Sequence, residues 1–367
     1  MVSGDTDVRV DQRAEDHSRG VHRMTNGSAF IDAQCVDIAR ENWNVKTFRF
    51  SLAHPQEPAR FEAGQYVTLS VDTGSETLYR CYTISSAPDA HGNATFEITV
   101  KRSPDGAVST WLHDRLAVGD RLQVSRPAGD FVLPTDPAEP LLFVAGGVGI
   151  TPLISMARAV HARGGGANIQ FLQFVRTPGD ILFHDELSRM ARASCGITPH
   201  FYTSDEASAE FSSGMLSREV LDRATPDWTS RRVLCCGPDA FMSVMRTLFL
   251  EHGGADSRFH QERFQLPEQT PAHVPDTLRI ARLSLSRSLL ALDCPPGTAI
   301  LDALHALPNG PRVPNACRSG VCGTCKLRKL DGRVEMHHNG GITDHEIDEG
   351  YILPCCSVPL SDVTLEL

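Results

Sequence analysis

The C-terminal part of the chain carries four cysteines whose spacing constrains both fold and chemistry. Three follow the pattern C-x4-C-x2-C, and the fourth comes after a long gap: Cys317, Cys322, Cys325 and Cys355. This order of spacings is typical of plant-type [2Fe–2S] proteins, whose thiolates hold the cluster. Gly320 and Gly323 lie inside the loop, where glycine lets backbone amides approach the cluster sulfurs without a side-chain clash. A structural zinc site usually takes two compact ligand pairs, and the second pair is missing here.

The fourth ligand is ambiguous from spacing alone. Cys355 and Cys356 are adjacent, and only one of them can complete the shell. The other would be a packed thiol.

Composition excludes several classes of protein. A chain of 367 residues with 22% charged residues is expected to form two or three globular domains. The formal net charge of −10 argues against nucleic acid or an anionic membrane as a partner. No apolar run approaches the length of a membrane span. An odd count of 11 cysteines with metal-type spacing indicates a reducing compartment, so we expect a cytoplasmic protein.

The pattern of apolar residues divides the chain into segments. Residues 1–28 are polar, lack the apolar core of a signal peptide and are predicted to form a disordered tail. Residues 29–137 contain short β-like runs separated by turns, which predicts an antiparallel β-barrel. Residues 138–266 alternate strands with helices, which predicts an α/β domain with a doubly wound parallel sheet. A proline-bearing linker at 267–277 leads to the cluster domain at 278–367.

One segment of the predicted barrel suits a flavin. Arg80, Tyr82 and Thr83 lie on an extended run, so Arg80 and Tyr82 are expected on one side and Thr83 on the other. Arginine can bind a phosphate, tyrosine can cover the ring system and the hydroxyl can bond near the reactive nitrogen. An ordinary strand with one exposed arginine is the alternative.

A glycine-containing loop then opens a predicted helix. Backbone amides after Gly106, together with Ser109 and Thr110, suit a pyrophosphate, although the same residues would also make a simple helix cap.

Two further turns lie where predicted strands pass into helices. The run Gly146-Gly147-Val148-Gly149-Ile150-Thr151-Pro152 suits the phosphates of a dinucleotide, with Thr151 expected as the N-cap and Pro152 as the first helical residue. The pair Cys236-Gly237 ends a later strand, where a thiol could contact a nicotinamide ring. A glycine-rich turn alone is weak evidence, and a buried cysteine is more often packing.

In this order, the motifs resemble those of the ferredoxin–NADP reductase superfamily, in the oxygenase-reductase branch with a C-terminal plant-type ferredoxin domain. The chain is also similar to the reductase partner of the hybrid-cluster protein. The resemblance covers residues 30–367 and implies a flavin barrel, a nucleotide domain and an α+β ferredoxin domain of β-grasp type.

The resemblance also implies roles for individual residues. It selects Cys355 as the fourth cluster ligand, and it places Thr83, Cys236, Glu262 and Phe264 at the reacting centre, with the Phe264 ring over the flavin. Cofactor contacts are expected from Arg80, Tyr82, Thr83, Ile98, Val100, Lys101, Gly106, Val108, Ser109, Gly146, Gly147, Gly149, Thr151, Pro152, Arg176, Asp180 and Gly237.

The donor and the acceptor implied by these domains transfer different numbers of electrons. A nicotinamide gives two electrons together as a hydride, whereas iron–sulfur acceptors take one at a time. We therefore expect hydride transfer from NADH to FAD and single-electron transfer through the cluster to a partner protein. FMN is the alternative flavin, since both flavins fit the same barrel. NADPH is the alternative nucleotide, because Asp180 would bind a ribose hydroxyl while Arg176 would favour a 2′-phosphate.

The expected partner is a terminal Rieske-type oxygenase, within systems that demethylate quaternary amines. A reductase for the hybrid-cluster protein is the second hypothesis. A redox-sensing flavoprotein without a downstream catalyst is the third.

Overall fold

The computed structural model describes most of the chain: residues 30–52, 60–74, 77–89, 94–104, 106–136, 139–193, 196–205, 211–264, 280–308, 310–315, 318, 320, 323–338, 341–342 and 344–367. The predicted tail (1–28), the predicted linker (267–277), Cys317 and Cys322 lie outside these residues.

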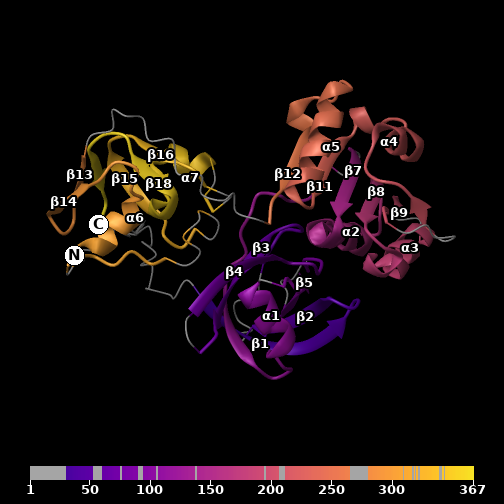
Figure 1. Ribbon diagram of the computed structural model, residues 1–367, viewed down its shortest axis with the longest axis horizontal. Helices are drawn as coiled ribbons and strands as arrows, with labels where there is room; N and C mark the ends of the chain where they lie inside the picture. Colours follow the sequence, from indigo (N-terminus) through magenta and orange to yellow (C-terminus); the bar gives the residue numbers. More distant parts are fainter. Residues whose placement is uncertain are drawn as a thin grey trace, which may run out of the picture.

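The first domain is an antiparallel barrel (Figure 1). Its sheet order is β4-β3-β6-β1-β2-β5, and an isolated bridge between Ile84 and Ile98 joins the two outer strands. Alternation explains the core, since Phe48 and Phe50 are fully buried while Arg49 between them is exposed. The predicted barrel is confirmed. Its elements are β1 (Phe30–Arg40), β2 (Val45–Leu52), β3 (Tyr66–Asp72), β4 (Thr77–Thr83), β5 (Thr95–Lys101), α1 (Ala107–Asp114) and β6 (Arg121–Ser125).

The second domain is a parallel sheet in the order β10-β9-β8-β7-β11-β12. Apolar residues of α2 and α3 pack in one core cluster and those of α4 and α5 in another, as a doubly wound sheet requires. This prediction is also confirmed. The elements are β7 (Pro140–Gly146), η1 (Gly147–Gly149), α2 (Ile150–Ala162), β8 (Asn168–Val175), η2 (Pro178–Asp180), α3 (His184–Arg192), β9 (Ile197–Thr203), β10 (Ser212–Ser213), α4 (Arg218–Ala224), η3 (Trp228–Ser230), β11 (Arg232–Cys236), α5 (Asp239–Glu251), η4 (Asp256–Arg258) and β12 (Phe259–Glu262).

The start of α2 differs from the sequence prediction. Thr151 was expected to cap the helix, but α2 begins at Ile150 and Gly149 occupies the cap position. The preceding glycines already form a turn of 3-10 helix that runs into α2. The Thr151 hydroxyl therefore donates backwards to the carbonyl of Val148 at 3.2 Å, and Pro152 falls inside the first turn.

The third domain has a five-stranded sheet in the order β14-β13-β19-β15-β17, in which β13 and β19 are parallel. Apolar residues of α6 belong to the same core as those of this sheet, which confirms the predicted α+β fold of β-grasp type. The elements are β13 (Ala281–Leu285), β14 (Leu290–Cys294), α6 (Ile300–Ala306), β15 (Leu327–Asp331), β16 (Val334–Met336), α7 (Asp344–Asp348), β17 (Tyr351–Ile352), η5 (Pro354–Cys356), β18 (Ser357–Pro359) and β19 (Val363–Leu365).

Across the described ranges, every helix is too short or too polar to cross a lipid bilayer.

Candidate functional site

The end of β4 carries the three residues predicted to contact a flavin. Arg80 is exposed and donates to the carbonyl of Tyr79 at 2.7 Å, Tyr82 is half-buried and Thr83 is buried. Burial raises the pKa of the Tyr82 phenol, so this side chain is neutral at physiological pH. β4 therefore presents a cation and a neutral aromatic at the barrel surface and ends in a buried threonine.

In the next segment, from β5 to α1, two of the residues predicted to contact a cofactor have buried side chains, which leaves only their backbone for such a contact. Ile98 and Val100 point into the barrel core because of the alternation along β5, so their side chains do not form a cofactor surface. Lys101, at the end of the strand, is exposed.

The start of α1 is built around a serine and a glycine. The Ser109 hydroxyl donates to the carbonyl of Gly106 and accepts from the amide of Ser103, both at 3.1 Å. A Cβ on Gly106 would lie 2.4 Å from the Ser109 oxygen, so glycine is needed for this closed loop. Val108 is buried beneath it.

The two glycine-bearing turns of the nucleotide domain touch each other. A Cβ on Gly149 would lie 2.3 Å from the carbonyl oxygen of Cys236, and one on Gly237 would lie 3.0 Å from the Cα of Gly146. Gly147 differs, because its φ is +55° and nothing lies within 4 Å of the position of a Cβ. These turns follow the adjacent strands β7 and β11, where the strand order reverses and ligands of such sheets bind. Gly147 thus borders open space that fits a dinucleotide's phosphates.

Three polar groups meet where the barrel contacts the nucleotide domain: the buried Thr83 and Cys236 and the partly buried Glu262. The Thr83 hydroxyl donates to Oε2 of Glu262 at 3.4 Å, and Cys236 is the registered neighbour of Glu262 on the adjacent strand. Burial raises the pKa of Glu262 to about 8, although the Thr83 bond acts against it. Burial, and then the charge of Glu262, raises the pKa of the Cys236 thiol. Phe264, two residues beyond Glu262, is 44% exposed.

A different arrangement surrounds Asp180. Its Oδ2 accepts from the amide and hydroxyl of Thr177 at 3.2 and 2.9 Å, which closes a capping box, and its Oδ1 accepts from the Trp43 indole at 3.2 Å. Both oxygens that were expected to face a ribose therefore already have protein donors.

Arg176 is paired with a residue that the sequence analysis did not single out. Its Nε donates to Oδ2 of Asp205 at 2.9 Å, with the two side chains 82% and 43% exposed. Asp205 follows β9 as Arg176 follows β8, so the shared carboxyl edge of these strands is the signal that could have found it.

Two of the predicted cluster ligands are among the described residues. The sulfurs of Cys325 and Cys355 lie 3.2 Å apart although they are 30 positions apart in the chain. The Cys356 thiol donates to the carbonyl of Leu353 in its own turn, at 3.5 Å, and also interacts with the Cys355 side chain. Gly323 has φ +67°, and a Cβ there would lie 2.6 Å from the carbonyl of Gly341. Converging thiols beside a glycine-dependent loop fit a [2Fe–2S] cluster held in part by Cys325 and Cys355.

The family comparison assigns each domain separately. Residues 32–133 match the oxidoreductase FAD-binding domain, 143–247 the oxidoreductase NAD-binding domain and 285–360 the 2Fe-2S iron-sulfur cluster binding domain. Together they define an oxidoreductase that uses FAD, a nicotinamide nucleotide and a [2Fe–2S] cluster.

Similar proteins share the whole arrangement. The chain is 38% identical to the glycine betaine monooxygenase reductase subunit of Chromohalobacter salexigens, covering 93% of this chain and 96% of the relative. It is 37% identical to the stachydrine N-demethylase reductase subunit Stc4 of Rhizobium meliloti (91% and 95% covered) and 35% identical to the NADH oxidoreductase HCR of Escherichia coli (90% and 96%). The solved structure of phthalate dioxygenase reductase matches with a TM-score of 0.56 and 28% identity, covering 92% of this chain and 98% of that one.

The chain therefore belongs to the family of reductase components that pass electrons from NADH through FAD to a [2Fe–2S] cluster. The predicted fold class, enzyme class and cofactors FAD, NADH and [2Fe–2S] are confirmed.

Proposed function

We propose that this reductase supplies electrons to a terminal Rieske-type oxygenase that demethylates a quaternary ammonium compound. The observation that carries the proposal is the similarity, over more than nine-tenths of the chain, to two reductase subunits whose names refer to glycine betaine and to stachydrine. The 35% identity to HCR makes a hybrid-cluster protein the competing acceptor. The cluster-type spacing of the cysteines, whose thiols must stay reduced to hold iron, supports a reducing compartment such as the cytoplasm.

When bound, FAD takes up two electrons as a hydride and releases them singly, which is what a [2Fe–2S] acceptor needs. Arg80 and Tyr82 would hold the flavin together with Lys101 and the loop of Gly106, Val108 and Ser109. The turns of Gly146, Gly147, Gly149 and Gly237, with Thr151 and Pro152 in the first turn of α2, would hold the nucleotide.

Thr83, Cys236 and Glu262 provide the environment of the reacting atoms. The buried Thr83 and Cys236 keep water from the floor of the site, and Glu262 keeps a proton at its carboxyl group near neutral pH. Because Cys236 is a buried, neutral thiol, it acts by contact with the nicotinamide and not as a nucleophile. Phe264 supplies an exposed ring at the same edge.

Reconstitution tests the identity of the acceptor. The purified reductase and NADH are mixed with a Rieske-type oxygenase and glycine betaine or stachydrine, and release of formaldehyde from the N-methyl group is followed. We expect the consumption of NADH to be coupled to the release of formaldehyde. Rapid reduction of the hybrid-cluster protein without coupled demethylation would instead identify the competing acceptor. Slow reduction of cytochrome c by NADH would favour the sensor hypothesis.

The fourth cluster ligand has its own test. Cys355→Ser should lose bound iron and the electron paramagnetic resonance signal of the reduced cluster, because its sulfur converges on Cys325. Cys356→Ser is the matched control and should keep both, since its thiol bonds the carbonyl of Leu353 and a serine hydroxyl can make the same bond. The reverse result would move the ligand to Cys356.

A further inference from the structure

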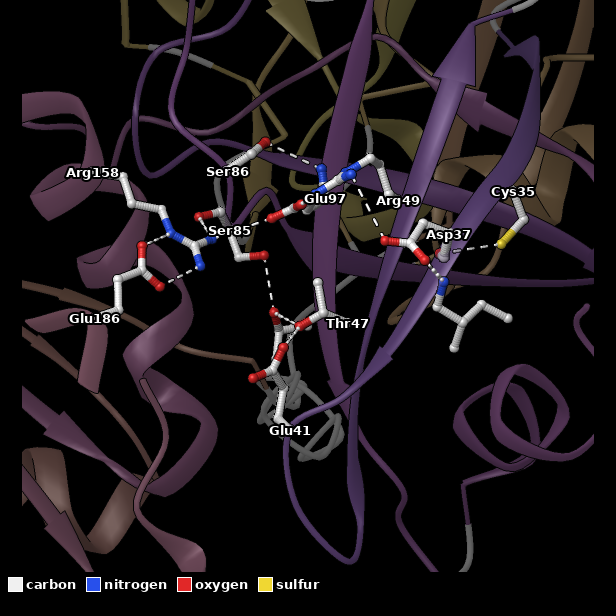
Figure 2. A network of polar contacts seen from close by, with 12 residues as sticks. Cys35, Asp37, Glu41, Thr47, Arg49, Ser85, Ser86, Glu97, Arg158 and Glu186 are labelled. Carbon is white, nitrogen blue, oxygen red and sulfur yellow. Dashed lines mark hydrogen bonds and ion pairs between the residues drawn. The ribbon is translucent and has the colours of Figure 1, made fainter. Parts of the chain in front are cut away.

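Arg158 connects the nucleotide domain to the flavin barrel. It lies on α2, and its Nε and Nη2 donate to the two carboxylate oxygens of Glu186 on α3, both at 2.8 Å. Its Nη1 reaches the barrel, where it donates to the carbonyl of Ser85 at 2.8 Å and to Oε2 of Glu97 at 3.3 Å (Figure 2). One guanidinium group therefore bonds residues of both domains.

A second side chain of α2 strengthens the same connection. The hydroxyl of Ser155, three residues before Arg158 and so on the same helix face, donates to the carbonyl of Ser86 at 2.7 Å. Two successive carbonyls of the barrel, at Ser85 and Ser86, thus accept bonds from one face of α2. They follow directly on the segment that ends in Thr83.

The junction is buried and its charges are compensated. The side chains of Arg158, Glu97 and Glu186 are 17%, 16% and 26% exposed, and the guanidinium carbon lies 5.0 Å from the centre of the Phe183 ring. Burial alone would lower the pKa of Arg158, but the hydrogen bonds and charge of Glu186, with Glu97, hold it above its ordinary value. A bidentate arginine fixes orientation as well as distance, which a single point charge cannot do.

The barrel side of the junction is itself held in place. Glu97 accepts two bonds from Arg49 of β2, at 2.6 and 2.9 Å, and its amide donates to the Ser86 hydroxyl at 3.1 Å. The Ser85 hydroxyl accepts from Thr99 of β5 at 2.9 Å (Figure 2). The barrel acceptors of Arg158 are therefore fastened to strands β2 and β5 of the barrel.

We propose that Arg158 is a positioning residue for hydride transfer. The inference rests on the electron path from NADH to FAD. The nucleotide turns lead into α2 and the flavin residues end β4, so each reactant is held by a different domain. Hydride transfer needs the reacting atoms within about 3–3.5 Å, and a misplacement of about 1 Å can slow a reaction on the order of a hundredfold. Arg158 and Ser155 fix the relative placement of the two elements that carry the reactants.

Anaerobic stopped-flow reduction of the FAD-loaded protein by NADH tests this proposal. Arg158→Met should lower the limiting rate of flavin reduction by about ten- to a hundredfold, while the Kd for NADH changes by less than about threefold. Arg158→Lys, which keeps the charge but not the fork, should lie between Arg158→Met and the unaltered protein. Arg102→Met is the matched control, because the ion pair of Arg102 with Asp114 is exposed and joins two residues of the same domain.

Two measurements separate positioning from a general structural role. With NADH bypassed by chemical reduction of the flavin, electron transfer onward to cytochrome c should be unchanged in Arg158→Met. Its FAD content should also equal that of the control. The proposal is wrong if the limiting rate of the loaded variant stays within about twofold of the unaltered protein, or if only the Kd for NADH rises.

A milder substitution covers the case in which Arg158→Met does not fold. Ser155→Ala keeps the ion pairs and should lower the same limiting rate by about threefold; an unchanged rate contradicts the proposal. Because flavin reduction is measured without any terminal acceptor, an error in the proposed oxygenase would not affect this result.

Discussion

The flavin barrel and the nucleotide domain meet at two partly buried carboxylates with opposite surroundings. Glu97 faces the guanidinium groups of Arg158 and Arg49, whereas the hydrogen-bond partner of Glu262 is the Thr83 hydroxyl at 3.4 Å. The pKa of Glu262 rises to about 8 because burial is not offset by a cation of this kind. Charge compensation is thus found where the orientation of the domains must be fixed. It is weak where a proton is to be held beside the reacting atoms.

The largest expected effect is on the free energy of unfolding at high pH, when Glu262, which is ionised there, is replaced by glutamine. Its ordinary pKa of 4.5 rises to about 8 on folding, so between these values the folded protein keeps a proton that the unfolded chain has lost. Stability therefore falls as the pH rises through this window. The full penalty, on the order of 5 kcal/mol, is present above pH 8 and absent below 4.5. Glu262→Gln should be more stable than the unaltered protein at pH 9 and nearly equal to it at pH 5.

Urea unfolding of both proteins across this pH range provides the measurement. Equal pH dependence of the two free energies of unfolding would show that Glu262 is ionised in the folded protein. The contrast with Glu97 would then disappear.

Arg158→Met should cost about 3 kcal/mol of stability, because it leaves Glu97 and Glu186 buried without this partner. Adding Glu186→Gln to the variant should recover part of the loss, since the charge of Glu186 is then removed, while Glu97 keeps its bonds from Arg49. Urea unfolding at pH 7 measures both. A loss no larger than that of Arg102→Met would mean that solvent compensates the two carboxylates.

The third place where the barrel meets the nucleotide domain is exposed, and its effect should be smaller. Trp43→Phe removes the indole bond to Asp180 and should cost about 0.5–1 kcal/mol. We expect an unchanged limiting rate of flavin reduction. A slowed rate would mean that this exposed contact also orients the domains.

The smallest effect should be a change in nucleotide preference. Asp205→Asn frees Arg176 from its carboxylate partner and should raise the ratio of kcat/KM for NADPH to that for NADH by about threefold. Asp180→Asn is the comparison, because Asp180 already holds its own turn and the Trp43 indole. If only Asp180→Asn changes the ratio, the original assignment to Asp180 is restored.

Local patterns predicted the elements of this protein well. The continuous apolar run at β7 reflects burial of both faces of the strand, and the alternation along β2 and β5 reflects burial of one face. Both patterns could be recognised in the sequence. The glycines marked the turns. Their contacts could not be predicted, because the close approach of Gly149 to the carbonyl of Cys236 joins two segments almost ninety positions apart.

The interface between domains was not predictable in the same way. Arg158 reads as one more charged residue of an amphipathic helix, and its barrel partners lie 61 and 73 positions away. The wrong prediction of Thr151 as the N-cap had a local cause. The 3-10 turn at Gly147–Gly149 runs directly into α2 and leaves Gly149 in the cap position. Long-range ion pairs need the packed domains before they can be seen.

Both α2 side chains at the junction bind main-chain oxygens, those of Ser85 and Ser86. A carbonyl is present whatever amino acid occupies the position, so mutation of the barrel residues leaves these acceptors in place. The evolutionary constraint therefore falls on the helix. Searches for compensating substitutions between the domains should detect the pairing of Arg158 with Glu97. They should miss the bond from Ser155 to the carbonyl of Ser86.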